Sequence, residues 1–140
     1  MLPIHFLSVL VAAVAAFIIG FLFHGPVFGK LWMKLANIHP TGNEKFSDMY
    51  RQMFWNLVVN IVTAYVLAVV YLFASTSIFT NGPGVSTGIM AGLWVWFGFI
   101  VTGSSIEVIW MKRSWKLWLF EVVASLVNFV VMGAIIAGMK

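Results

Sequence analysis

The chain has 140 residues, of which 62% are hydrophobic and 9% charged, and its formal net charge is +4. A mean hydropathy of +1.02 excludes a water-soluble domain, because such a chain would expose apolar side chains on every helix face. Cysteine is absent, which excludes disulfides, thiolate catalysis and cysteine-ligated metal or iron–sulfur centres. The basic residues flank apolar segments, so the positive charge indicates contact with lipid headgroups and not with nucleic acid.

Four long apolar segments predict an all-α membrane protein with four antiparallel transmembrane helices in a single domain, residues 1–140. The predicted helices cover about residues 3–23, 54–73, 88–109 and 117–139. Each is close to the ~20 residues that a helix needs to cross ~30 Å of hydrocarbon. No basic residue precedes the first segment, so we expect it to be a retained helix and not a cleaved signal.

A short amphipathic helix at the membrane interface is predicted after the first crossing, at residues 27–37. Its apolar residues recur at helical spacing: Phe28, Leu31, Trp32 and Leu35. Lys30 and Lys34 lie on the other face, where their side chains can reach lipid phosphates. Thr41 and Glu44 have the spacing of a capping box, so a further helix is expected to start there. That helix either continues unbroken into the second crossing or kinks at the membrane surface.

The distribution of basic residues predicts the orientation in the membrane. Seven of the eight lie in two of the three gaps between the apolar segments: Lys30, Lys34, Lys45, Arg51, Lys112, Arg113 and Lys116. The gap at residues 74–87 has no charge. By the positive-inside rule, residues 24–53 and 110–117 are cytoplasmic and both termini lie outside. The side chains expected at the lipid headgroups are Lys30, Trp32, Lys34, Lys112, Arg113 and Lys116.

The sequence from Gly20 to Met33 resembles the first-helix signature of a family of small four-helix bacterial membrane proteins of unknown function. The core of the likeness is Gly25-Pro26-Val27-Phe28-Gly29-Lys30, and Phe23-His24 stands where that family typically has Trp-Tyr. Residues 112–117 and 132–137 are similar to the third turn and the last helix of the family. The resemblance implies the same four-helix topology in a bacterial inner membrane, and it implies no particular chemistry.

Polar side chains inside the predicted helices are the candidate functional residues, because they are costly in a bilayer. Glu107 and Glu121 are placed symmetrically about the inner turn, so we expect them at similar depth. The other members of this candidate cluster are His24, Asn56, Asn60 and Asn128. Helical spacing places Glu121, Ser125, Asn128 and Met132 on one face, and Thr102 and Gly103 lie at a matching level. These faces are expected to converge on one cytoplasm-facing polar cavity with His24 at its rim.

An alternative interpretation assigns these residues a structural role. Each glutamate then pairs with Arg113, Lys116 or Lys30 at the headgroups, and Asn60 and Asn128 form interhelical hydrogen bonds worth about 1 kcal/mol. The outer halves of the helices are expected to be dry, since only Tyr65, Tyr71 and scattered Ser and Thr residues are polar there.

No cofactor and no metal are expected. His5 and His24 lie about 28 Å apart on one predicted helix, and the other three predicted helices contain no histidine, so one chain cannot hold a haem between two histidines. His24, Glu107 and Glu121 are possible metal ligands by type, but they are three single residues that belong to no metal-binding motif. No catalytic or nucleotide-binding motif is present, so we do not expect an enzyme.

Three classes of function remain. The first is a non-catalytic membrane component, either a structural or accessory subunit or a small oligomer, with the bilayer and a second copy or another membrane protein as partners. The alternative is a small-solute or proton transporter or channel that uses the Glu/Asn cluster. The third is a membrane enzyme, which only Glu107 and Glu121 favour. Gly88-x-x-x-Gly92 and the small residues at 133–138 can pack within the chain or between copies.

Overall fold

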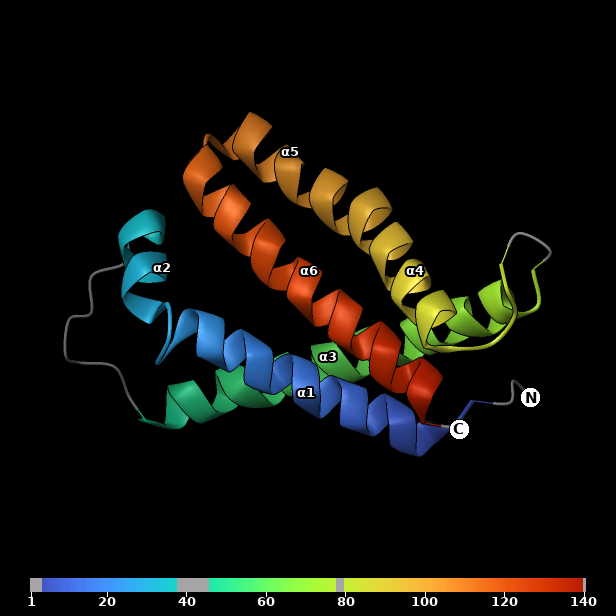
Figure 1. Ribbon diagram of the computed structural model, residues 1–140. Helices are drawn as coiled ribbons and strands as arrows, with labels where there is room; N and C mark the ends of the chain where they lie inside the picture. Colours follow the sequence, from blue (N-terminus) through green and yellow to red (C-terminus); the bar gives the residue numbers. More distant parts are fainter. Residues whose placement is uncertain (1–3, 38–45, 78–79, 140) are drawn as a thin grey trace.

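The computed structural model describes residues 4–37, 46–77 and 80–139, and these residues contain helices and no strand. In chain order the elements are α1 (Phe6–His24), α2 (Gly29–Ala36), α3 (Phe46–Ser75), α4 (Val85–Val95), the π-helix η1 (Trp96–Val101), α5 (Thr102–Met111) and α6 (Trp115–Gly138) (Figure 1). Helices α4, η1 and α5 follow one another without a break. Within the described residues, four helical stretches are long and apolar enough to cross a membrane, which is the predicted number of such helices.

Helix boundaries differ from the expected ones by a few residues where local capping decides them. Helix α6 starts at Trp115, because the Ser114 hydroxyl accepts a hydrogen bond from the backbone N–H of Lys116 at 3.2 Å. Helix α3 continues unbroken from Phe46 to Ser75, the first of the two alternatives. The proposed capping box at residues 41–44 lies outside the described residues. Helix α2 is shorter than expected and ends at Ala36, because the next residue, Asn37, has left-handed backbone angles.

The buried core follows the seam where α1, α3 and α6 meet. Small side chains dominate it on α1 and α3, and Ala12, Ala13 and Ala64 are completely buried. Leu67 and Met132 are 1% exposed and fill the space between these alanines. Alanine lets helix backbones approach closely, which is the usual source of packing energy between helices in a membrane. These buried positions therefore mark where α1 and α3 pack into the core.

The glycines of α4 pack against α6 within the chain. A Cβ atom at Gly88 would overlap the Gly133 carbonyl oxygen and the Ala137 side chain, and one at Gly92 would lie 2.5 Å from the Phe129 carbonyl oxygen. Only glycine fits at such close backbone contacts. Of the two roles left open for Gly88-x-x-x-Gly92, the structure therefore shows packing inside the chain.

The π-helix η1 changes which face the following helix presents. A π-helical turn has i→i+5 hydrogen bonds and so adds a residue, which rotates later side chains by about 100°. Trp96 at its start is anchored to α6, because its indole N–H donates to the Val122 carbonyl at 3.0 Å and to the Ser125 hydroxyl at 3.1 Å. Beyond η1, Thr102 and Gly103 are exposed. The expectation that they join the polar cavity is therefore wrong, since regular α-helical spacing does not hold through this segment.

Candidate functional site

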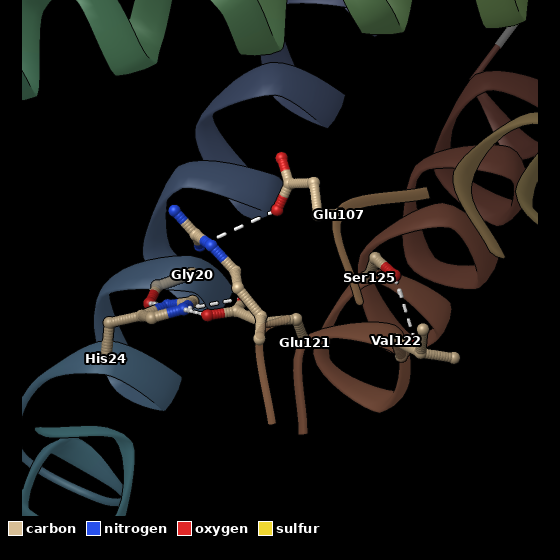
Figure 2. A network of polar contacts seen from close by, with 7 residues as sticks. Gly20, His24, Glu107, Glu121, Val122 and Ser125 are labelled. Carbon is tan, nitrogen blue, oxygen red and sulfur yellow. Dashed lines mark hydrogen bonds and ion pairs between the residues drawn. The ribbon is translucent and has the colours of Figure 1, made fainter. Parts of the chain in front are cut away.

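The last residue of α1, His24, contacts Glu121 of α6. His24 Nε2 lies 3.0 Å from each carboxylate oxygen of Glu121, and His24 Nδ1 lies 2.9 Å from the Gly20 carbonyl oxygen (Figure 2). Both ring nitrogens thus face oxygen acceptors, an arrangement that the doubly protonated imidazolium satisfies with two donated hydrogen bonds. This pair joins residues that are 97 positions apart in the chain.

The turn after α1 brings aromatic side chains around His24. A Cβ atom at Gly25 would lie 2.6 Å from the Phe21 carbonyl oxygen, so the turn requires glycine at this position. Beyond the turn, the Trp32 ring lies edge-on to the imidazole with a centroid separation of 5.0 Å, and Phe120 of α6 does the same at 5.8 Å. The two rings flank the imidazole and restrict its orientation.

Glu107 has a different partner from Glu121. Its Oε2 lies 3.5 Å from Arg113 Nη1, and both side chains are 53% exposed, so the pair contributes little to stability (Figure 2). Glu107 and Glu121 do line one narrow cavity of about 40 Å³, next to Ser104 and Trp118. The glutamates therefore lie near one another as expected, but one pairs with an arginine, as in the structural interpretation, and the other with a histidine.

A larger cavity of about 580 Å³ lies between α1, α2, α3 and α6, and we name it the amide cavity. Its polar lining residues are His24, Gln52, Asn56, Asn60 and Asn128. Its apolar lining residues include Ala16, Phe17, Phe21, Trp32, Met49 and Met53. The structure thus brings His24 and the three predicted asparagines to one cavity. It leaves Glu107 outside, and Glu121 reaches the cavity through His24.

The asparagine side chains of this cavity do not bond across helices as the structural interpretation requires. Asn60 Nδ2 donates to the Asn56 carbonyl oxygen at 2.9 Å, one turn earlier on the same helix. Asn128 Oδ1 is buried and has no hydrogen-bond partner among the described residues. A buried acceptor without a donor is uncommon and needs an explanation such as a bound molecule.

A second cavity of about 390 Å³, which we name the His5 cavity, lies at the other end of the same seam. Its polar lining residues are His5, Ser8, Tyr71 and Ser75. His5 Nδ1 lies 3.1 Å from the Met139 carbonyl oxygen, which joins the start of α1 to the end of α6 (Figure 1). Sequence reasoning missed this cavity and expected a dry outer half. The available signal was the helical spacing of His5 with Ser8 and of Tyr71 with Ser75.

One apolar layer separates the two cavities. On α1 the amide cavity involves residues from Ala16 onward, and the His5 cavity involves residues up to Ser8. Between them lie the buried Ala12 and Ala13, and the corresponding positions on α3 and α6 are Ala64, Leu67 and Met132. We name these five residues the apolar layer. The eight residues from Ser8 to Ala16 correspond to about 12 Å of helix, so the layer is thin compared with a ~30 Å bilayer.

The residues expected at lipid headgroups are mostly exposed. This applies to Lys30, Lys34, Lys112, Arg113 and Lys116. Trp32 differs, because it is half-buried and lines the amide cavity. Across the described ranges, no group of three or more His, Asp or Glu side chains is arranged to hold a metal ion.

Comparison with known families matches residues 7–137 to the family described as "Protein of unknown function (DUF1761)". No curated protein matches the chain significantly. No solved structure does so either. The match covers nearly the whole chain, and its description carries no activity.

Proposed function

The chain belongs to the DUF1761 family of unknown function, and we propose from its geometry that it is a non-catalytic transporter of small polar solutes. The observation that carries this proposal is the pair of cavities at opposite ends of one helix seam. A transporter needs a solute site near the middle of the membrane and a barrier that closes one side at a time. The amide cavity supplies such a site, and the apolar layer supplies such a barrier.

The amide cavity favours an uncharged polar solute. Carboxamide groups donate and accept hydrogen bonds, and the buried Asn128 Oδ1 needs a donor that the described residues do not supply. A solute with N–H or O–H groups would satisfy it. A volume of about 580 Å³ is within the range of small-molecule sites. In this proposal His24, Asn60 and Asn128 contact the solute, and Glu121 positions His24.

The orientation follows from the charges. We propose that the four helices cross a bacterial inner membrane in alternating directions, with both termini outside. The positive-inside rule supports this, since Lys30, Lys34, Lys112, Arg113 and Lys116 all lie toward one end of the bundle in this arrangement. The amide cavity then opens toward the cytoplasm and the His5 cavity toward the outside. Helix α2 lies in the cytoplasmic interface, with its exposed lysines directed to lipid phosphates.

Osmotic swelling of proteoliposomes tests the proposal. Urea, acetamide and glycerol serve as uncharged probes, and we expect faster swelling than in protein-free liposomes for at least one of them. The chain has no native cysteine, so Asn56→Cys can be modified selectively with a bulky maleimide, which should block the swelling. Swelling rates equal to those of protein-free liposomes, or rates unaffected by the modification, would refute transport through the amide cavity.

A second candidate is the non-catalytic accessory subunit or small oligomer. It is favoured by Gly98 and Gly103, where an added Cβ atom would meet nothing within 4 Å, although both lie in a membrane-spanning stretch. Exposed small residues on such a helix are typical of contacts with another helix. Gly98→Phe should then abolish co-purification of a partner in mild detergent. If the natural chain co-purifies with a second copy of itself, it is an oligomer. If it co-purifies with a different protein, it has an accessory role.

A further inference from the structure

An apolar groove lies between α2 and α6, separate from both cavities. Its volume is about 330 Å³, and its lining residues are Phe23, Phe28, Leu31, Leu35, Lys116, Leu119, Phe120 and Val123. The groove forms because the chain turns at Gly25-Pro26 and α2 then packs beside the first half of α6 (Figure 1). Apart from Lys116, every side chain on its walls is apolar.

The charged residues on the segments around this groove are basic except Glu121, whose carboxylate is paired with His24. Lys116 lies in the first turn of α6, where the helix dipole adds partial positive charge. Lys112 and Arg113 precede it in the turn, and the exposed Lys30 and Lys34 are the charged residues of α2. The groove therefore combines apolar walls with a positively charged end.

We infer that the groove binds one anionic phospholipid, with an acyl chain along its walls and the phosphate at Lys116. The charge complementarity selects an anionic headgroup. The walls favour an acyl chain over an extended peptide, because they offer no hydrogen-bonding partner for a peptide backbone. This lipid would hold α2 against α6, and since α2 contributes Trp32 to the amide cavity, it would also stabilise that wall. The inference does not depend on transport.

Competition between two lipids tests it. The delipidated protein is given equal amounts of phosphatidylglycerol and phosphatidylcholine in mild detergent, and native mass spectrometry measures which lipid is retained. We expect preferential retention of phosphatidylglycerol. Lys116→Gln should lower the preference for phosphatidylglycerol over phosphatidylcholine about fivefold, because the variant loses one lysine contact with the anionic headgroup. Lys112→Gln is the matched control: Lys112 is exposed near the positive end but does not line the groove, so its loss should lower the preference much less than Lys116→Gln does.

A second pair of variants tests the groove itself. Val123→Trp places a large ring in the groove, whereas Leu10→Trp adds the same ring at an exposed position on α1. We expect Val123→Trp to reduce retention of both lipids and Leu10→Trp to change neither. Equal retention of the two lipids by the natural chain, equal effects of the two lysine variants, or equal retention by the two tryptophan variants would each overturn the inference.

Discussion

His24 at the end of α1 and Glu121 near the start of α6 are joined by contacts of 3.0 Å to both carboxylate oxygens. The contact fixes α6 against α1 at the edge of the amide cavity. It also places a charged group behind His24, the one histidine among the described residues that lines this cavity. The pair therefore contributes to stability and to the shape of the proposed solute site.

Glu121→Gln should lower the free energy of unfolding by about 1 kcal/mol. This is below the usual value for a charge-assisted hydrogen bond, because both side chains are about one-third exposed and solvent screens the pair. Glu107→Gln is the matched control and should change it by less than about 0.5 kcal/mol, since the Glu107–Arg113 pair is half exposed. Reversible unfolding in mixed micelles measures both variants. A loss in Glu107→Gln as large as that in Glu121→Gln would contradict this assignment.

Gly88→Ala should destabilise the bundle by about 1–3 kcal/mol, because its new methyl group would overlap the Gly133 backbone and force α4 away from α6. Gly98→Ala should instead be neutral or stabilising by up to about 1 kcal/mol, because its methyl group meets open space and alanine favours helix. Thermal unfolding in detergent compares the two. If both substitutions had the same effect, the close contact of α4 with α6 would be refuted.

Asn128→Leu should stabilise the fold and impair solute permeation. The substitution removes a buried acceptor without a partner, which costs about 1–3 kcal/mol in the natural chain. Asn60→Leu is the control for stability alone, because Asn60 already bonds to its own helix and its stability should change little. Both residues line the amide cavity, so both variants should impair permeation. Unfolding and liposome swelling are measured on the same preparations. Loss of stability together with normal permeation in Asn128→Leu would contradict the proposed role.

Lys112→Gly should stabilise the turn between α5 and α6 by up to about 1 kcal/mol. Lys112 has φ 55°, a left-handed conformation that glycine adopts without the clash of a Cβ atom. Lys112→Val should destabilise the turn, because a β-branched residue tolerates this conformation poorly. Unfolding measurements on the two variants should move in opposite directions, and a shift in the same direction would argue against this backbone geometry.

Hydropathy was sufficient to find the four apolar helices, because each is close to or longer than the ~20 residues that a bilayer requires. The rotation of each helix about its axis was harder to predict. The spacing of Glu121 and Asn128 placed them on one face, and both do lie toward the α1 side. The prediction that Thr102 and Gly103 face the polar cavity was wrong, because nothing in the sequence indicated the extra residue of the π-helix η1. The Glu121 partner was also missed, since His24 and Glu121 are 97 positions apart and local sequence patterns do not show that α1 and α6 bring them together.

The most direct test of the central claim is labelling of single cysteines in oriented membrane vesicles with a membrane-impermeant maleimide. Asn56→Cys reports the amide cavity, Ser75→Cys the His5 cavity, and Ala64→Cys the apolar layer. We predict that Asn56→Cys reacts only from the cytoplasmic side, Ser75→Cys only from the opposite side, and Ala64→Cys from neither. Reaction of Asn56→Cys and Ser75→Cys from the same side, or of Ala64→Cys as fast as the others, would contradict two cavities separated by one barrier.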